Sequence, residues 1–571
     1  MKIISKIFFL KPILDKLPKL LNRRHKIYML VMFFLCIFYS LVETLGISVI
    51  MPFISLASDP QLLNSGFYKT IFDYLNFNSP ESFIIALGIG IICFYIFRAV
   101  YSVFLTYFTI RFSAGIHKYL SKNIFKTYMS VSYKVYAQKN SAELMQIIVS
   151  ETGDVSKIIL NLLQICSEFF TILLIYAVII ILNWKMTLVV TGVLLFMVIF
   201  LLSSLTKINK VQGKKRLTSA RKMNRTLKET FGNLKYVKLK GNEKTILGNY
   251  DATIETRIRS EVINNVLDIV PKSILESIGF SFLVGVVVFI VWLYRDASKV
   301  IPIISMYALA LYRILPSVNR MLQYINRITY TEKSLESVYE NLNQPVETEG
   351  TGSVEFNRSI SLKDISFRYL TGKDVLTGIS LEIEKGEKIA ITGESGGGKS
   401  TLVDIIIGIH EPVRGSVFID DTAITDDNIR SWRKKIGYIP QSIYLFDGTV
   451  AENVSFGSQP NEDRIIKALQ MANIWGFLET KEGLLTRVGD GGIQLSGGQQ
   501  QRIGIARALY DDPEVLVLDE ATSSLDNETE QKIMDEIYTV SADKTLIVIA
   551  HRLSTVERCG RKIRIEEGKI V

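Results

Sequence analysis

The sequence predicts a chain of two parts, a helical membrane domain with six crossings and an α/β domain built around a phosphate-binding loop. Three observations predict this fold class. Hydrophobic residues make up 48% of the 571 residues although 21% are charged, a combination unusual for a wholly soluble or a disordered protein. Apolar stretches long enough to cross a bilayer, about 20 residues each, recur in the first 342 residues. A glycine-rich loop follows a strand-like run in the second part.

Charge divides the chain at the same place. Residues 1–342 carry 40 Lys+Arg and 20 Asp+Glu, a net charge of +20, whereas residues 343–571 carry 26 and 36, a net charge of −10, and the two sum to the overall +10. The total alone would suggest a nucleic-acid partner. Its distribution instead indicates a basic membrane domain joined to an acidic one, so we expect no nucleic acid to bind.

The membrane domain is expected to span residues 1–342, followed by a polar linker at 343–357 and the second domain at 358–571. The six crossings are predicted at 27–56, 83–110, 158–182, 186–204, 274–294 and 300–322. Lys and Arg gather in the connections 111–157, with seven, and 205–271, with fifteen. Positively charged connections remain in the cytoplasm, so both long connections and the second domain are predicted to be cytoplasmic.

Two amphipathic segments flank the first crossing. Residues 2–20 combine apolar residues with lysines and are predicted to form a helix lying on the membrane surface. After Asp59-Pro60, apolar residues recur at helical spacing and predict a short helix on the outer surface. That outer helix either packs against the neighbouring crossings or contacts a lipid-like substrate.

Several ionisable residues fall within or at the end of predicted crossings, where an unpaired charge is costly. Arg98, Arg313 and Arg320 are candidates to line a cavity that attracts an anionic head group, because the guanidinium group suits phosphate. The alternative is that these arginines form ion pairs with residues such as Glu43 or Glu276 and fix helix packing.

The second domain contains a phosphate-binding loop in the context that its chemistry requires. Residues 387–401 read EKIAITGESGGGKST, a strand-like run, a glycine loop and the start of a helix. Backbone N–H groups of such a loop converge on phosphate, while Lys399 reaches the terminal phosphates and the Ser400 hydroxyl suits Mg²⁺. The predicted phosphate-binding residues are Gly393, Glu394, Ser395, Gly396, Gly397, Gly398, Lys399, Ser400 and Thr401.

An acidic pair ends a second apolar strand, VLVLDE. Asp519 is the predicted Mg²⁺ ligand, directly or through water, and Glu520 is the candidate general base for the attacking water. With the phosphate loop earlier in the chain, the pair indicates nucleotide hydrolysis, with ATP and Mg²⁺ as cofactors.

The stretch QLSGGQQQRIGIARAL (494–509) resembles the signature motif of ATP-binding cassette transporters, and the span from about 360 to the end follows the pattern of that family. The resemblance implies an exporter-type half-transporter that hydrolyses ATP as a homodimer, without a periplasmic binding protein. It implies short coupling helices near Tyr133–Leu144 and Thr226–Tyr236. Asp490 departs from the glutamate that such exporters commonly carry before the signature.

The resemblance also assigns roles to individual residues. Tyr369 is similar to the aromatic residue that stacks on adenine, Gln441 to the loop glutamine that senses Mg²⁺, His551 to the γ-phosphate switch and Asp526 to the loop across the dimer. The signature residues expected to contact the partner's ATP are Ser496, Gly497, Gly498 and Gln499.

The run ALYRILPSVNRMLQYINRITY (310–330) resembles a subgroup that exports glycan lipids, the lipid-linked oligosaccharide flippases of bacterial protein N-glycosylation. This implies transport of an undecaprenyl diphosphate-linked oligosaccharide between the leaflets of the bacterial inner membrane, among membrane lipids as partners. A multidrug or lipid A exporter of the same architecture is the alternative.

Overall fold

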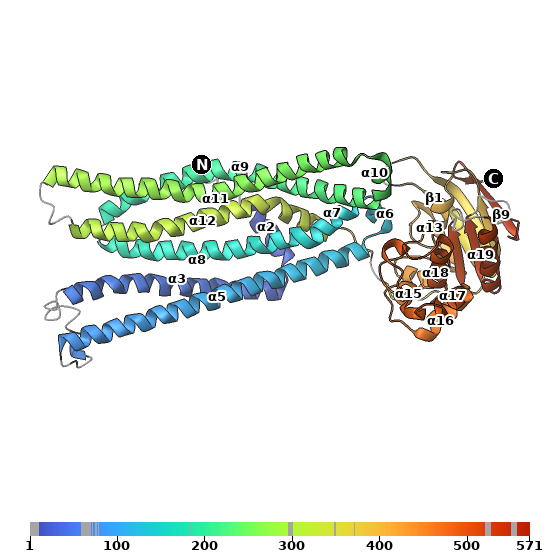
Figure 1. Ribbon diagram of the computed structural model, residues 1–571, viewed down its shortest axis with the longest axis horizontal. Helices are drawn as coiled ribbons and strands as arrows, with labels where there is room; N and C mark the ends of the chain where they lie inside the picture. The colour runs from blue at the N-terminus through green and yellow to red at the C-terminus, as the bar shows by residue number, and fades with distance from the viewer. Residues whose placement is uncertain are drawn as a thin grey trace. The chain divides into compact units, whose positions relative to one another are not determined.

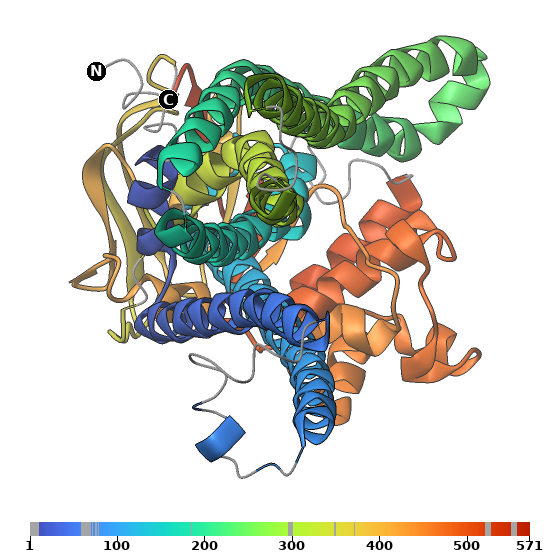
Figure 2. The same cartoon turned by 90° about the vertical axis from the view of Figure 1, so that its left-hand side faces the viewer.

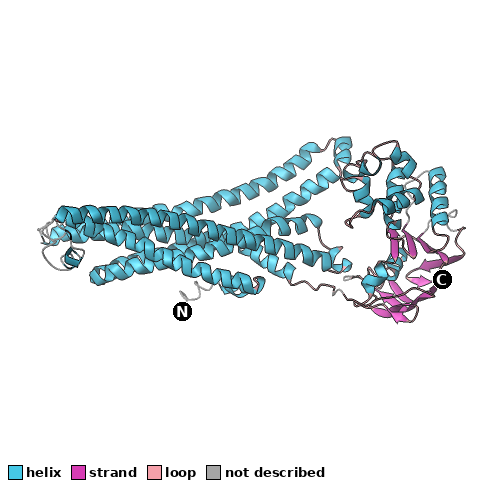
Figure 3. Cartoon of the chain, turned by 90° about the horizontal axis from the view of Figure 1, so that it is seen from below, coloured by secondary structure: helices cyan, strands magenta, loops and turns pink. Residues whose placement is uncertain are grey.

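The computed structural model describes residues 11–58, 70, 72–74, 77, 79–182, 184–294, 301–347, 350–369, 372–519, 527–549 and 557–571, with most of their side chains. The chain forms two compact units. The first comprises Met1–Met129 and Lys139–Gln344, and the second comprises Ser130–Gln138 and Pro345–Val571. Among the described residues, all strands belong to the second unit (Figure 3). The predicted outer helix after Asp59-Pro60 lies almost entirely outside the described residues.

Long helices lying lengthwise build the first unit (Figure 1). Three of them, with 51, 49 and 52 residues, far exceed the roughly 20 residues that cross a bilayer. They therefore extend beyond it. The helices are α2 (Lys11–Leu20), α3 (Arg23–Ser58), α5 (Pro80–Ser130), α7 (Ser141–Gln146), the π-helical turn η3 (Ile147–Glu151), α8 (Thr152–Leu182), α9 (Trp184–Gly232), α10 (Leu234–Lys240), α11 (Glu243–Tyr294) and α12 (Ile301–Leu342).

By length and composition, four helical stretches among the described residues can cross a membrane: Arg23–Gly46, Pro80–Ser130, Ser141–Ala177 and Thr191–Gly232. The predicted crossings at 274–294 and 300–322 belong to α11 and α12, but many of their side chains fall outside the described residues. Viewed along the bundle, α9 and α11 extend away from the other helices as a hairpin closed by α10 (Figure 2).

The described part of the N-terminal segment, α2, is amphipathic as predicted, and its place on the membrane surface stays a prediction. Its apolar residues Ile13, Leu17 and Leu20 are buried in a protein core formed with α5, α8 and α12. On its polar side, Lys16 pairs with Glu336 of α12 at 3.4 Å. The amphipathic pattern was identified correctly, but the surface that covers its apolar face is protein.

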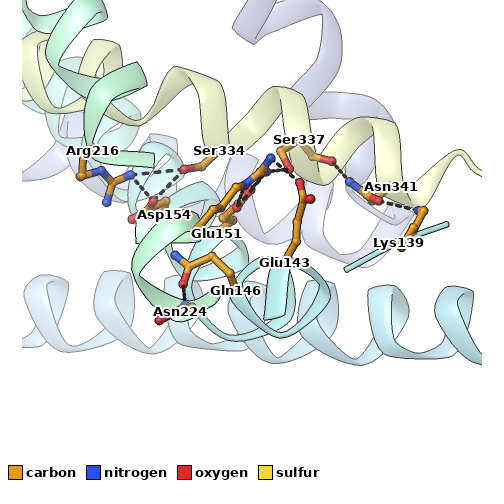
Figure 4. Close-up of polar contacts among 11 residues, drawn as sticks. Lys139, Glu143, Gln146, Glu151, Asp154, Arg216, Asn224, Ser334, Ser337 and Asn341 are labelled. Carbon is orange, nitrogen blue, oxygen red and sulfur yellow. Dashed lines mark hydrogen bonds and ion pairs between the residues drawn. The ribbon is translucent and has the colours of Figure 1, made fainter. Parts of the chain in front are cut away.

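A buried polar network ties η3 and α8 to α9 and α12 (Figure 4). Glu151 is fully buried and accepts hydrogen bonds from Arg221 of α9 at 3.0 and 3.2 Å. Arg221 also donates to Ser337 of α12 at 2.8 Å. One turn farther along α8, the Asp154 carboxylate pairs with Arg216 at 2.5 Å. Each acid is buried with a hydrogen-bonded basic partner, which is what a charge inside a helix bundle requires.

The backbones of α9 and α12 approach closely beside this network. A Cβ added to Gly213 would lie 2.1 Å from the carbonyl oxygen of Tyr330. Real Cβ atoms do not tolerate such a distance, so Gly213 permits the contact between the two helices.

Two sheets form the frame of the second unit. The antiparallel sheet has the order β2–β1–β4–β5 and the mainly parallel sheet the order β10–β9–β3–β8–β7–β6. Their strands are β1 (Ser359–Phe367), β2 (Leu376–Glu384), β3 (Lys388–Thr392), β4 (Arg414–Ile419), β5 (Thr422–Ala423), β6 (Ile436–Ile439), β7 (Val515–Asp519), β8 (Thr545–Ile549), β9 (Arg561–Glu566) and β10 (Lys569–Ile570).

Helices and two core clusters cover this frame. Residues of β7 alternate between the clusters: Val515 and Val517 pack toward the antiparallel sheet and α13, and Leu516 and Leu518 toward α15–α19. Because both faces are covered, the parallel strands read as continuous apolar runs. The helices are α6 (Tyr133–Tyr136), α13 (Lys399–Ile406), α14 (Ile429–Arg433), α15 (Val450–Ser455), α16 (Glu462–Met471), α17 (Trp475–Glu479), η4 (Gly483–Leu485), η5 (Asp490–Gly492), α18 (Gly497–Leu509) and α19 (Asn527–Val540).

The start of β1 is fixed by the carboxylate of Asp420, in the turn after β4. It accepts hydrogen bonds from the backbone N–H groups of Asn357, Arg358 and Ser359 at 2.9, 2.7 and 3.0 Å. Burial would raise the pKa of this carboxyl, but these donors hold its pKa below the usual value.

Candidate functional site

The glycine loop follows β3 and leads into α13, as predicted from the sequence. Gly393 has φ +138°, and a Cβ there would lie 2.1 Å from the carbonyl oxygen of Ile565. Gly396 and Gly398 also have positive φ values, +83° and +102°. These conformations favour glycine, so three of the four predicted loop glycines serve its backbone shape.

Lys399 is the first residue of α13 and is only 5% exposed. Its ammonium group donates to the carbonyl oxygens of Gly393 at 2.9 Å and Glu394 at 2.8 Å. The loop is therefore wrapped around the cation that would meet the phosphates, next to a helix N-terminus that favours anions. The other predicted loop residues, Ser395, Gly397, Ser400 and Thr401, lie in the loop or the first turn of α13.

Ser400 and Asp519 meet at the end of β7. The Ser400 hydroxyl lies 3.5 Å from Asp519 Oδ1, and the Tyr438 hydroxyl donates to Asp519 Oδ2 at 3.0 Å. Burial and the Asp519 charge raise the pKa of the nearby Asp404 to about 6. Hard oxygen donors with excess negative charge fit Mg²⁺. When bound, the ion would neutralise charge on the β- and γ-phosphates.

Strand register brings the rest of the predicted chemistry toward the same edge. β8 lies between β3 and β7, and Ile549 is level with both Ile391 and Asp519. Glu520 directly follows Asp519 in the sequence, and His551 follows Ile549 by two residues. Glu520, Asp526 and His551 themselves lie outside the described residues, so their predicted roles stay predictions.

Tyr369 and Gln441 lie in loops beside this site. The Tyr369 hydroxyl is 3.1 Å from that of Thr401, so the candidate adenine-stacking ring is joined to the first turn of α13. Tyr369 is 40% exposed, which leaves part of its ring open to a ligand. Gln441 follows β6 and is exposed.

The signature sequence opens α18. Ser496 caps this helix: its hydroxyl accepts from the N–H of Gln499 at 3.4 Å, and the Gln499 side chain accepts from the N–H of Ser496 at 2.9 Å. Gly497 and Gly498 occupy the first turn. This reciprocal cap presents a helix N-terminus suited to phosphate.

Arg507, near the other end of α18, donates to the carbonyl oxygens of Asn453 and Tyr444 at 2.8 and 3.1 Å. It therefore fixes the segment that follows Gln441 to the signature helix. Neither Arg507 nor Tyr438 was singled out from the sequence. The position of Tyr438, three residues before Gln441 in a buried strand, is the signal that could have found it.

Two of the three arginines proposed to line a substrate cavity form ion pairs. Arg98 lies 3.2 Å from Glu43, and Arg320 contacts Glu168 at 2.5 and 3.0 Å. Ion pairs that fix helix packing are the alternative that the sequence left open. Glu43 is one of the partners expected, whereas Arg320 pairs with Glu168 and not with Glu276. The side chain of Arg313 lies outside the described residues.

Comparison with known families matches both units. Residues 26–314, just over half of the chain, match the ABC transporter transmembrane region, and residues 376–523 match the ABC transporter family.

Individual relatives agree with this result. The chain is 28% identical over 459 residues to an ATP-dependent lipid A-core flippase of Burkholderia pseudomallei (strain 1710b), covering 78% of this chain and 76% of the relative. It is 28% identical over 483 residues to the heterocyst differentiation ATP-binding protein HepA of Nostoc sp., covering 83% and 78%. Its fold is similar to that of a bacterial Atm1-family ABC exporter with ATP bound, at 22% identity, TM-score 0.77, and 96% and 94% coverage.

Proposed function

The chain belongs to the ABC transporter family, and on that premise we propose that it is a homodimeric flippase that moves an undecaprenyl diphosphate-linked oligosaccharide from the inner to the outer leaflet of a bacterial inner membrane. ATP-driven export follows from the family and the exporter fold. What we propose beyond ATP-driven export is the cargo, the number of chains and the orientation in the membrane.

The observation that carries the ATP-driven part is the convergence of Lys399, Ser400 and Asp519 at the edge of the parallel sheet. In the proposed cycle, Lys399 binds the terminal phosphates and Ser400 with Asp519 holds Mg²⁺. Glu520 accepts the proton of the attacking water, Gln441 senses the ion and His551 contacts the γ-phosphate.

The proposal of a homodimer rests on the resemblance to exporter-type half-transporters, in which two nucleotide domains share each ATP. The binding site of an ATP at the phosphate loop would be completed by Ser496, Gly497 and Gly498 of a second copy. The N-terminus of that copy's α18 would face the γ-phosphate. Asp526 would then lie at the dimer interface.

The choice of cargo depends on the resemblance of residues 310–330 to glycan-lipid exporters. The ion pairs of Arg98 and Arg320 reduce the support for a diphosphate site built from these arginines, because each guanidinium is already neutralised. A lipid A-core glycolipid is the second candidate, favoured by the flippase name of the Burkholderia relative. Both cargoes share a phosphorylated head, a glycan and long apolar chains.

The test is reconstitution of the full chain into proteoliposomes with outward-facing nucleotide domains. One set contains a fluorescent undecaprenyl diphosphate-linked oligosaccharide and another contains labelled lipid A-core. Added ATP should make the oligosaccharide inaccessible to a glycosidase outside the vesicle, and Glu520→Gln protein should not. Protection of lipid A-core alone would transfer the assignment to the second candidate. Vigorous ATP hydrolysis with neither glycolipid protected would remove both.

A further inference from the structure

The short helix α6 is part of the same compact unit as the nucleotide site. It stands between α5 and α7 in the chain, yet Ser130–Gln138 belongs to the second unit. The backbone N–H of Glu347 donates to the carbonyl oxygen of Ser130 at 2.6 Å, and the Lys134 ammonium lies 5.3 Å from the centre of the Phe367 ring. These contacts place α6 against the end of β1.

Next to α6 lies the imidazole of His410, which is only 4% exposed. It stacks on Phe367, with ring centres 5.0 Å apart and an angle of 22°. The edge of Tyr369 meets it at 5.6 Å and 88°, and Tyr133 of α6 lies against it at 5.9 Å. All three distances fall in the range of attractive aromatic pairs. His410 thus contacts both the candidate adenine-stacking ring and α6.

The imidazole acts here as a flat ring rather than as a hydrogen-bonding group. Its Nδ1 is buried and has no hydrogen-bond partner in the described part of the chain. Its Nε2 is 3.8 Å from the Asp404 carboxylate, beyond hydrogen-bond distance. Its neighbours Phe367, Tyr369 and Tyr133 therefore contact it by ring packing.

We propose that His410 is a positioning residue that links Tyr133 of α6 to Tyr369, so that the seating of α6 sets how well Tyr369 binds the adenine of ATP. The inference rests on the proposed ATP site, because Tyr369 is the stacking residue only if that site binds ATP. It adds an aromatic connection from the helix to the base, separate from the phosphate chemistry.

The geometry gives a specific expectation. Tyr133 does not belong to the phosphate loop, yet its removal should weaken ATP binding by loosening His410 and then Tyr369. Since one aromatic pair is worth about a two- to tenfold change in affinity, we expect Tyr133→Ala and His410→Ala each to raise the KM for ATP by that factor. The kcat should stay within about twofold of the parent value, because neither ring touches the reacting phosphate.

The experiment measures basal ATP hydrolysis and binding of a fluorescent ATP analogue by the full chain in detergent. Tyr136→Ala is the matched control, since Tyr136 lies on the same helix and its ring meets Tyr133 rather than His410. His410→Phe should retain parental KM, whereas His410→Leu should behave like His410→Ala. The double variant Tyr133→Ala/His410→Ala should be no worse than the worse single variant, because both break one connection.

Failure of the aromatic connection and failure of the proposed ATP site would give different results. If Tyr369→Ala and Lys399→Ala weaken nucleotide binding but Tyr133→Ala does not, the ATP site stands and the connection is overturned. Additive effects in the double variant, or rescue by His410→Gln but not by His410→Phe, would overturn it as well. If Lys399→Ala leaves binding unchanged, the proposed ATP site itself is wrong. The melting temperature of His410→Phe is measured as well. A parental value shows that this variant is folded, so that its KM reports on the aromatic connection.

Discussion

Replacing Arg221 by methionine tests the buried polar network most directly. The substitution keeps an unbranched apolar stem but removes the guanidinium that donates to Glu151 at 3.0 and 3.2 Å. Glu151 is fully buried, so its carboxylate would lose its basic partner without gaining water. Breaking a buried pair in this way costs about 3–5 kcal/mol. We therefore expect Arg221→Met to be strongly destabilising.

The assay is thermal unfolding of the purified chain in detergent, followed by circular dichroism of its helices. The expected loss corresponds to a fall of roughly 5–15 °C in melting temperature. Arg225→Met is the matched control, because Arg225 pairs with Glu229 on the exposed surface of the same helix. Solvent-exposed pairs of this kind add little to stability, so the melting temperature of Arg225→Met should hardly change.

The double variant Arg221→Met/Glu151→Gln provides the refutation. Glutamine removes the charge that Arg221→Met leaves unpaired, so the double variant should recover at least half of the lost stability. If the double variant is as unstable as Arg221→Met, the loss does not come from a buried unpaired charge. If Arg221→Met melts like the parent, the network does not stabilise the bundle.

Three further perturbations have defined outcomes. Glu520→Gln should bind ATP but stop turning it over and accumulate as an ATP-bound dimer in size-exclusion chromatography; rapid steady turnover would remove its role as base. Gly213→Ala should destabilise the helical unit by about 1–3 kcal/mol, seen as a lower melting temperature, because its Cβ would clash with Tyr330; an unchanged melting temperature would refute that. Asp420→Asn should have a lower free energy of unfolding than the parent at pH 7. Because the pKa of Asp420 is lowered in the folded state, its carboxylate stabilises the fold only when ionised, so this difference should narrow as the pH falls below about 5. A difference that is constant with pH would contradict this.

The nucleotide site could be predicted from the sequence because its residues are close together in the chain or follow recognisable strands. The loop glycines, Lys399 and Ser400 lie within eight residues, and their backbone requirements are local. Asp519 is distant in sequence, but the apolar strand before it marks where it must emerge. Parallel pairing through β8 then brings it to the loop.

The membrane half was harder to predict because its decisive contacts are long-range. Arg320 and Glu168 are 152 residues apart, and a single sequence does not tell which acid an arginine will meet. For α2, the helical period of apolar residues was sufficient to predict an amphipathic helix. That period is the same whether the apolar face meets lipid or protein, so it could not reveal the protein core that buries Ile13, Leu17 and Leu20.

The burial of α2 has a consequence for how the protein is made. Lys16 pairs with Glu336, 320 residues later in the chain. At a synthesis rate of about 5–20 residues per second, α2 waits roughly 15–60 s before α12 exists. During that interval its apolar face has no α12 to cover it, so we expect the nascent helix to rest on the lipid surface. Completion of α12 then covers this face with protein, while Leu14 of the same helix stays exposed.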